Sequence, residues 1–337
     1  MRRKVCCFLI SLALILTLCT GCAPKPYSKT IFAMDTVMTL TAYGENAQDA
    51  VEAAVARLFE MDALFSVTNP KSEIATLNAA DGADVTVSPE VYGLLETAVA
   101  YSEKFAGYFD ITISPIVALW GFYSDVFAVP DAAAVQDALT QVDYHFVNLK
   151  SDLTVSLDGG AQIDLGAIAK GYAAEQVREV FANYGVQNAL IDLGGNILAL
   201  GSKQGAASWR VAVRDPFDSA AQLCILAVSN QALVTSGSYQ RYFEQDGVRY
   251  HHIMSPETGE PAESDLISVT VITDDALYAD TLSTALFVMG SDRAAAYWRS
   301  SHDFEAVFVR TSGEILCTPG VMAMLAEPND TLRQIVK

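Results

Sequence analysis

The sequence QIDLGAIAKGY at residues 162–172 lies at a strand-to-helix junction. Residues 153–157 before it alternate like a strand, and residues 173–183 after it are helix-forming and end at Gly185. Gly166 and Gly171 permit tight turns and let another group approach the backbone closely. Free N–H groups at a helix start favour an anionic ligand, and Lys170 adds a positive charge there. The spacing is neither G-x-G-x-x-G nor a Walker A loop, so a purely structural turn is the alternative.

The composition is that of a globular protein with an acidic body. Of the 337 residues, 51% are hydrophobic and 18% are charged, which is enough apolar material for a sizeable core. Net charge is −19; Arg2, Arg3 and Lys4 contribute three positive charges before Cys22, so the remainder carries −19 minus 3, or −22. Such a body repels nucleic acid and anionic membrane. We expect no nucleic-acid partner, and an anionic ligand would need a local cation or a metal bridge.

The N-terminus has the layout of an export signal. A basic start is followed by an apolar run at residues 5–18 and then by Cys19-Thr20-Gly21-Cys22. Small residues before Cys22 resemble the bacterial lipobox, in which the cysteine is lipidated, although Cys19 stands where leucine is usual. We therefore expect a signal peptide at 1–21, a lipidated tether at 22–30 and one domain at 31–330, anchored by lipid on the extracytoplasmic face of the cell membrane. An ordinary cleaved signal is the alternative; a spanning helix is disfavoured because the run is short.

Outside the export segment only two cysteines remain, Cys224 and Cys317, each in an apolar stretch. We expect both to be buried small apolar residues. A single bridge between them stays open, because nothing in their spacing supports or excludes it.

Strand-like and helix-like segments alternate irregularly, which predicts an α+β fold rather than a doubly wound α/β fold. Cap signals at Asn46, Ser88-Pro89 and Asp275 predict three helices, residues 131–140 predict a short Ala-rich helix, and residues 291–300 look helical. Residues 66–78 are polar and predict a loop, and residues 108–115 look extended. Strands are expected at 36–43, 146–149, 153–157, 189–193, 197–200, 209–213, 223–228, 233–236, 239–244, 248–253, 266–273, 306–310 and 314–317, with a hairpin turn at Asp246-Gly247.

Two adjacent histidines, His251 and His252, end one predicted strand and precede a turn-rich segment. Adjacent strand residues point to opposite faces, so only one can face a given pocket. A histidine titrating near neutral pH suits general-base work. Surface or core histidines in a hairpin are the alternative.

Asp280, Ser283 and Thr284 fall at i, i+3 and i+4 of the predicted helix at 275–288, hence on one face. Oxygen ligands on an otherwise apolar helix suit Mg²⁺, which takes one or two carboxylates and completes its shell with water and phosphate. A solvated polar face is the alternative. The small residues 235–239 form a predicted turn that could hydrogen-bond a ligand.

These features occur together in an order that closely resembles the ApbE family, the FAD:protein FMN transferases. The likeness runs from Met34 to about Gly290. Its pieces are Ala33-Met34-Asp35-Thr36, Ser72-Glu73-Ile74, Phe109-Asp110-Ile111-Thr112, Trp120-Gly121-Phe122, residues 164–172, Gly194-Gly195-Asn196, residues 235–239, His252-Ile253, Pro256-Glu257-Thr258-Gly259 and residues 279–284. Asp35 replaces the family's usual glycine, Ser255 an aspartate, Thr68 an aromatic and Ser283 a second acid.

The resemblance implies a single large domain of antiparallel sheets with flanking helices, related to the T-fold. It also implies an Mg²⁺-dependent reaction in which FAD and a protein Ser or Thr give an FMN-protein and AMP. Asp280, Thr284, Ser283 and the Ala167 carbonyl would hold the metal, and His252 would take the acceptor proton. FAD would be contacted by Met34, Thr68, Tyr108, Phe109, Asp110, Asp164, Lys170 and Met254.

The implied acceptor is an extracytoplasmic flavoprotein, such as an FMN-carrying subunit of a Na⁺-pumping NADH:quinone reductase (Nqr) or Rnf-type complex, or a small FMN-binding domain. Two other readings stay open. The same groups acting on water would make an FAD pyrophosphatase that gives FMN and AMP. A lipoprotein that only stores or delivers FAD would need neither Asp280 nor His252.

Overall fold

The computed structural model describes residues 25–124 and 126–335. The export segment and Cys22 lie outside the described residues. Within the described ranges, no helix combines the length and apolarity that a bilayer crossing requires.

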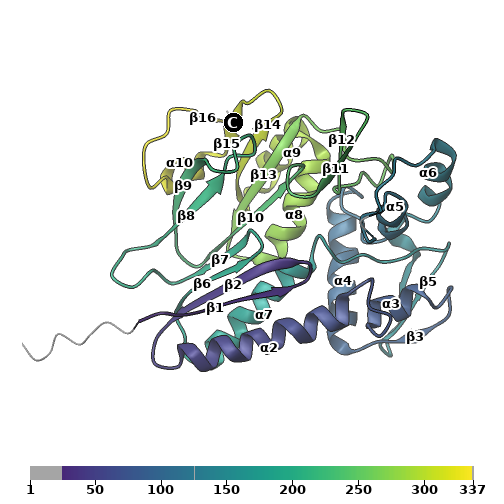
Figure 1. The fold of residues 1–337 in the computed structure, drawn as a ribbon, viewed down its shortest axis with the longest axis horizontal. Coiled ribbons are helices and arrows are strands. Elements are labelled where there is room, and N and C mark those ends of the chain that lie inside the picture. Colours follow the sequence, from purple (N-terminus) through teal and green to yellow (C-terminus); the bar gives the residue numbers. More distant parts are fainter. Residues whose placement is uncertain (1–24, 125, 336–337) are drawn as a thin grey trace, which may run out of the picture.

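One large sheet organises the described part of the chain, with nine strands in the order β1-β2-β6-β7-β10-β13-β14-β15-β16 (Figure 1). Neighbouring strands are antiparallel except β15 and β16, which are parallel. The strands are β1 Tyr27–Ala33, β2 Thr36–Tyr43, β6 Asn188–Leu193, β7 Asn196–Leu200, β10 Gln231–Gly237, β13 Leu266–Thr273, β14 Glu305–Arg310, β15 Ile315–Cys317 and β16 Leu332–Gln334. The expected α+β class with antiparallel sheets is confirmed.

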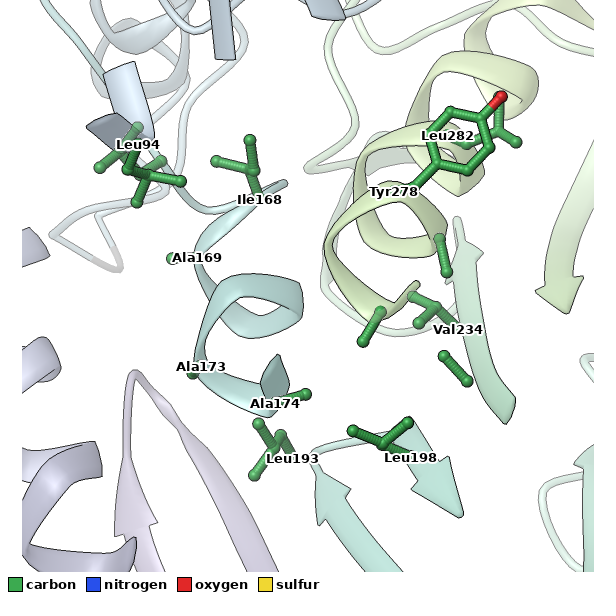
Figure 2. Close-up of a cluster of buried hydrophobic side chains, with 14 of the residues drawn as sticks. Leu94, Ile168, Ala169, Ala173, Ala174, Leu193, Leu198, Val234, Tyr278 and Leu282 are labelled. Atoms are coloured by element: carbon green, nitrogen blue, oxygen red, sulfur yellow. The ribbon is translucent and has the colours of Figure 1, made fainter. Parts of the chain in front are cut away.

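Three helices cover one face of this sheet: α2 Ala47–Phe65, α7 Ala169–Asn183 and α8 Ala276–Met289 (Figure 1). Helix α8 is apolar on nearly all sides and is correspondingly buried. It packs against β10 and β13 of the sheet and against helix α7. Figure 2 shows the start of α7 next to α8, with Leu193, Leu198 and Val234 of the sheet beneath them. The largest hydrophobic core therefore lies between the helices and the sheet.

The opposite face is covered by a hairpin of β8 Trp209–Arg214 and β9 Gln222–Val228, together with α10 Pro319–Met324. Successive side chains of β14 point to opposite faces of the sheet. Val307 therefore packs against the hairpin, and Phe308 packs against the helices. Cys224 and Cys317 lie in this second core as free, buried thiols, as predicted, and burial raises the pKa of each to about 11.

A smaller lobe lies at one end of the sheet (Figure 1). It contains α3 Glu73–Asn78, β3 Val85–Thr86, α4 Pro89–Lys104, α5 Ser114–Leu119, α6 Ala132–Leu139, β4 Val147–Leu149 and β5 Thr154–Leu157. The hairpin of β11 Tyr242–Gln245 and β12 Val248–His251 packs its aromatic rings against α5 and the residues that follow it. Helix α9, Ser291–Ser301, follows α8.

Most predicted elements with a capping signal are confirmed. Ser88 Oγ accepts from the Val91 amide at 3.2 Å, and Asp275 Oδ1 accepts from the Tyr278 amide at 3.0 Å. The hairpin turn has φ 52° at Asp246 and 77° at Gly247. Asn46 precedes α2 as predicted, but its side chain donates to the Tyr184 carbonyl at 3.0 Å instead of capping the helix.

Four expectations are wrong. The tether predicted to extend to residue 30 is already strand from Tyr27, because β1 pairs along its whole length with β2. The loop predicted at 66–78 contains α3, whose start is capped by Ser72. The segment 108–115 is a turn that leads into α5 rather than an extended stretch. The domain continues beyond residue 330, since β16 pairs with β15.

Candidate functional site

The junction that begins at residue 162 contacts α8 directly. Gly171 is the third residue of α7, and its amide is one of the helix-start N–H groups that have no intrahelical partner. This amide donates to Asp280 Oδ2 at 2.8 Å. A Cβ atom on residue 171 would lie 2.4 Å from the Ala276 carbonyl oxygen and 2.8 Å from Leu277 Cα. Only glycine therefore allows α7 and α8 to come this close.

Asp280 is only 3% exposed, and both of its carboxylate oxygens accept hydrogen bonds. Asn196 Nδ2, at the start of β7, donates to Oδ1 at 2.8 Å, while Gly171 donates to Oδ2. Each carboxylate oxygen has two lone pairs, so each retains capacity for a further partner. The two donors fix the direction of the carboxylate before any ligand arrives.

Three hydroxyls meet one helical turn along α8 from Asp280, and one of them contacts the Asp280 backbone. Ser283 Oγ donates to the Asp280 carbonyl at 2.9 Å. Ser236 Oγ, near the end of β10, lies 2.8 Å from Ser283 Oγ and 3.2 Å from Thr284 Oγ1. Ser283 is fully buried, whereas Thr284 keeps some exposure, so Thr284 is the more accessible of the two predicted hydroxyl ligands. The predicted turn at 235–239 is wrong in part, because residues 235–237 belong to strand β10.

These oxygens fit a hard cation. Asp280 supplies the carboxylate, and Ser283 and Thr284 supply hydroxyls on the same helix face. In the described ranges no group of three or more His, Cys, Asp or Glu side chains is arranged to hold a metal. A single carboxylate suffices for Mg²⁺, which keeps water and phosphate ligands. Ala167 lies in the turn just before α7, whose third residue, Gly171, contacts Asp280.

The earlier part of the junction is held by Asp164. Its Oδ1 accepts from the Gly166 amide at 2.6 Å, and its Oδ2 accepts from the Tyr123 hydroxyl at 2.6 Å. Burial and the nearby Asp164 charge raise the pKa of Tyr123 well above its ordinary value. Lys170 Nζ donates to the Gly166 carbonyl at 3.0 Å. The candidate FAD residues Asp164 and Lys170 both contact Gly166, in the turn that leads into α7.

His252 and His251 face different surroundings, as predicted. His252 Nδ1 lies 3.0 Å from the Arg241 carbonyl oxygen. A carbonyl can only accept, so Nδ1 carries the proton and Nε2 has the free lone pair. Burial, with the charges of His251, Lys170 and Arg241 adding to it and the hydrogen bond to the Arg241 carbonyl opposing it, lowers the pKa of His252 to about 4, below the near-neutral range expected from the sequence. His251 packs edge-on against Phe287 at 5.5 Å, and burial lowers its pKa to about 4 as well.

The remaining flavin candidates are more dispersed. Met34 lies in the β1–β2 turn, where its amide donates to Asp62 Oδ1 at 3.1 Å. Thr68 is exposed, while Phe109 and Met254 are buried in hydrophobic clusters. Asp110 already accepts hydrogen bonds from the Thr112 and Tyr144 amides. Burial raises the pKa of Asp110, against these hydrogen bonds. Its side chain stabilises a turn.

A cleft of about 730 Å³ lies beside Tyr108 and Asp110. Its walls are acidic: they include Asp143, Glu257, Glu260, Glu263, Asp265 and Asp292, against Arg293 alone. The Arg293 guanidinium is already engaged by another residue of the cleft, since its Nη1 donates to the Tyr108 hydroxyl at 2.5 Å. An anionic pyrophosphate is disfavoured in such a cleft. The lining contains none of Lys170, His252 and Asp280, so this cleft is not built from those candidate residues.

Asn196 and Ser236 lie in stretches that carry the family resemblance, but sequence reasoning gave neither of them, nor Tyr123 or Arg241, as a partner of Asp280, Ser283, Asp164 or His252. Asn196 follows Gly194-Gly195, a pattern that ordinarily signals only a turn. The others come from segments far from the residues that they contact. A hydroxyl or an arginine in a strand-rich stretch carries no signal of such a contact by itself.

Known proteins resemble this chain along most of its length. The model of the ApbE family matches residues 34–308. An FAD:protein FMN transferase of Treponema pallidum is 35% identical, covering 88% of each chain, and one of Klebsiella pneumoniae is 36% identical, covering 87% of this chain and 92% of the relative.

Solved structures agree with the sequence relatives. The ApbE protein of Thermotoga maritima superposes with a TM-score of 0.85 at 32% identity, covering 90% of this chain and all of that one. The apo flavinyl transferase ApbE of Pseudomonas stutzeri gives 0.81 at 28% identity, covering 91% and 98%. With the family model matched across both the sheet and the α7–α8 junction, this chain belongs to the ApbE family.

Proposed function

We propose that this chain is an FAD:protein FMN transferase that uses Mg²⁺ to move FMN from FAD to a Ser or Thr hydroxyl of an acceptor protein, with release of AMP. The observation that carries the proposal is the contact between Asp280 and the start of α7, the helix that also carries Lys170, while the helix of Asp280 carries Ser283 and Thr284. The relatives that bear this activity in their names cover most of the chain.

Asp280, Thr284 and Ser283, with the Ala167 carbonyl, would hold Mg²⁺. When bound, the ion offsets negative charge on the pyrophosphate and on the departing AMP. Lys170 supplies a further positive charge beside the phosphates, and the helix start of α7 supplies oriented N–H groups. Asp164 and the backbone of residues 108–110 would position FAD, with Met34, Thr68 and Met254 nearer its rings.

His252 would act as the base. Its Nε2 accepts the proton of the acceptor hydroxyl while that oxygen attacks the phosphorus of the FMN half. The phosphorus–oxygen bond to the AMP half breaks, and AMP leaves with the bonding electron pair. The protonated ring then returns its proton to solvent. Because Nδ1 is already committed to the Arg241 carbonyl, the ring has one nitrogen for this task.

The reaction would take place outside the cytoplasm. A basic start, an apolar run and Cys22 favour export and a lipid anchor on Cys22. Strand β1 begins at Tyr27, so only residues 23–26 would separate the anchor from the sheet. Extended chain spans at most about 3.6 Å per residue, which would keep the domain within roughly 18 Å of the anchor. Acceptors would be extracytoplasmic flavoproteins such as FMN-carrying subunits of Nqr- or Rnf-type complexes.

The test is a direct transfer assay. Residues 23–337 are incubated with FAD, Mg²⁺ and a candidate FMN-binding domain, and flavin fluorescence is read in a denaturing gel at the mass of the acceptor. The matched control is the same acceptor with its hydroxyl residue replaced by alanine. Fluorescence on the first acceptor alone is the expected result. AMP and FMN released without a labelled acceptor would identify a pyrophosphatase, and FAD bound without turnover would identify a storage protein.

A further inference from the structure

The Arg241 side chain is anchored where three segments meet. It follows β10, precedes β11 and contacts the residues after α5. Its Nη2 donates to the Phe122 carbonyl, and its guanidinium carbon lies 5.7 Å from the centre of the Phe122 ring. Phe122 is fully buried in the cluster formed by α5, α6 and the β11–β12 hairpin. The guanidinium is therefore attached to a rigid part of the small lobe.

The backbone of the same residue holds His252. The Arg241 carbonyl accepts from the His252 amide at 3.1 Å and lies 3.0 Å from His252 Nδ1. The His252 ring also packs against Phe122, with ring centres 6.4 Å apart and an interplanar angle of 63°. One buried phenylalanine thus contacts both the side chain that fixes residue 241 and the imidazole that residue 241 orients.

We propose that Arg241 is a positioning residue for His252. Its side chain fixes the carbonyl that keeps the proton on Nδ1, and so leaves Nε2 free to accept the proton of the acceptor hydroxyl. The inference rests on the proposed function and extends it to a residue outside the metal and FAD sets. In a free imidazole both neutral tautomers are populated, so a fixed carbonyl at Nδ1 selects the catalytically useful one.

The guanidinium also adds a positive charge near the imidazole. The charges of His251, Lys170 and Arg241 disfavour a second proton on the His252 ring, whereas the hydrogen bond to the Arg241 carbonyl favours it more strongly than the Arg241 charge opposes it. Loosening that hydrogen bond in Arg241→Met should therefore lower the pKa of His252 further. The acid limb of kcat/KM, which reports the free enzyme, should move to lower pH in the same direction.

The experiment compares Arg241→Met with Arg249→Met in residues 23–337. Arg249 is a suitable control because its guanidinium lies 4.0 Å from the Tyr242 ring and pairs with Glu244 in the adjacent hairpin, away from His252. The tautomer of His252 is read without FAD from ¹⁵N chemical shifts of the imidazole, with His252→Ala for assignment. We expect the Nδ1–H form in the wild type and in Arg249→Met, and a mixture of tautomers in Arg241→Met.

Transfer kinetics supply the second readout. Arg241→Met should lower kcat by about 10- to 100-fold, a part of the 10²–10⁴ that a general base contributes. It should leave FAD affinity within about threefold, since the proposed contact is to the base. In a His252→Ala background, Arg241→Met should cause no further loss, because residues that act through one group are not additive. Arg241→Lys should recover little, because an ammonium cannot reproduce the guanidinium's planar contacts.

Three results would overturn the proposal: an unchanged tautomer in Arg241→Met, an equal loss of rate in the His252→Ala background, or a large loss of FAD affinity with kcat retained. The last would make Arg241 a direct contact of FAD. A His252→Ala variant with full rate would instead remove His252 as the base, while the tautomer measurement would still decide whether Arg241 positions the ring. The urea midpoint of unfolding is measured for each variant, and an unchanged midpoint shows that its altered tautomer, rate or affinity does not come from a folding defect.

Discussion

At the residue scale, the close packing of α7 against α8 depends on the absence of a side chain at Gly171. Gly171→Ala would place a methyl group against the Ala276 carbonyl and Asp280 Cβ, at 2.4 and 2.7 Å. We expect a loss of about 1–3 kcal/mol in the free energy of unfolding, as for other overpacked sites, together with loss of transfer activity. Urea unfolding measures the first effect. Gly93→Ala in α4, where nothing lies within 4 Å, should instead stabilise by about 0.5–1 kcal/mol; equal effects would refute the packing argument.

Asp280 accepts two hydrogen bonds that hold the fold and is a proposed ligand of Mg²⁺, and two measurements on one variant test these roles separately. Asp280→Asn keeps the shape but has a single acceptor oxygen for two donors, Gly171 and Asn196, so about 1–3 kcal/mol of stability should be lost. It should also abolish the rise in melting temperature on adding Mg²⁺ that we expect for the wild type. Asp275→Asn is the control, because asparagine caps a helix as well as aspartate does. A Mg²⁺ response that survives in Asp280→Asn would remove Asp280 from the metal set.

The β1–β2 turn is strained in this chain. Met34 and Asp35 have φ of 47° and 57°, and Asp35 stands where the family usually has glycine. Asp35→Gly should raise the free energy of unfolding by about 0.5–1 kcal/mol, since glycine adopts this conformation without steric cost. Asp35 also opposes the charge of Asp62, whose pKa is raised by burial and then by Asp35.

The matched control for Asp35→Gly is Asp246→Gly, at φ 52° in the β11–β12 turn. Both aspartates have a positive φ, so glycine should relieve backbone strain at either position. Only Asp35 also repels a second carboxylate, that of Asp62. At pH 7 the gain at residue 35 should exceed the gain at residue 246, and the difference should shrink as pH falls and Asp62 is protonated. Melting temperatures at pH 7 and pH 4 test this; a smaller gain at residue 35 would contradict it.

At the scale of elements, sequence reasoning succeeded where a local signal exists. The starts of α4, α6 and α8 carry side-chain caps, which require only neighbouring residues. Strand β1 was missed because its exposed face carries Ser28 and Thr30, so it reads as polar linker until its pairing with β2 is known. The helix face of Asp280 followed from i, i+3 and i+4 spacing. The contacts of Asp280 with Gly171 and Asn196 depend on three elements meeting, which no local pattern encodes.

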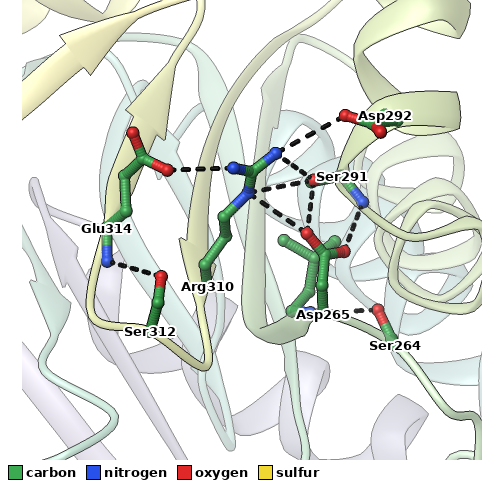
Figure 3. Close-up of polar contacts among 8 residues, drawn as sticks. Ser264, Asp265, Ser291, Asp292, Arg310, Ser312 and Glu314 are labelled. Carbon is green, nitrogen blue, oxygen red and sulfur yellow. Dashed lines mark hydrogen bonds and ion pairs between the residues drawn. The ribbon is translucent and has the colours of Figure 1, made fainter.

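A polar network around Arg310 joins β14 to the start of α9 (Figure 3). Arg310 contacts Asp265 at 3.1 Å, Ser291 Oγ at 2.7 Å and Glu314 at 2.9 Å. Burial acts in the opposite direction, yet the Ser291 hydrogen bonds and the Arg310 charge hold the pKa of Asp265 below its ordinary value of 3.8. Asp265, Ser291 and Asp292 also line the acidic cleft, so the network supports its wall.

Arg310→Met should lower the free energy of unfolding by about 1 kcal/mol, because its partners are partly exposed. A depressed carboxylate pKa gives stability that is present above the unfolded value near 3.8 and is lost as pH falls through the folded value. The deficit of the variant should therefore be full at pH 6 and smaller below pH 4. Arg210→Met, which breaks an exposed pair with Glu327, should change stability by less than about 0.5 kcal/mol. Urea unfolding at both pH values decides; a deficit that grew below pH 4 would contradict the assignment.

At the scale of the whole molecule, the sheet begins almost at the expected anchor. Strand β1 is an edge strand, and it also holds α2, since Tyr27 and Lys29 both contact Glu52, at 2.7 and 2.5 Å. A chain beginning at residue 34 would lose these contacts and expose the edge of β2, a template for unwanted pairing. A chain beginning at residue 25 would keep them.

We therefore expect the chain from residue 25 to behave like residues 23–337, and the chain from residue 34 to melt at a clearly lower temperature and to aggregate at micromolar concentration. The chain from residue 31, the boundary expected from sequence, keeps only three of the seven paired residues of β1 and should fall between them. Melting curves and light scattering compare the three. Equal melting temperatures for starts at 25 and 34 would mean that β1 belongs to a flexible tether after all, and the proposed anchor on Cys22 would then leave the domain free to move away from the membrane.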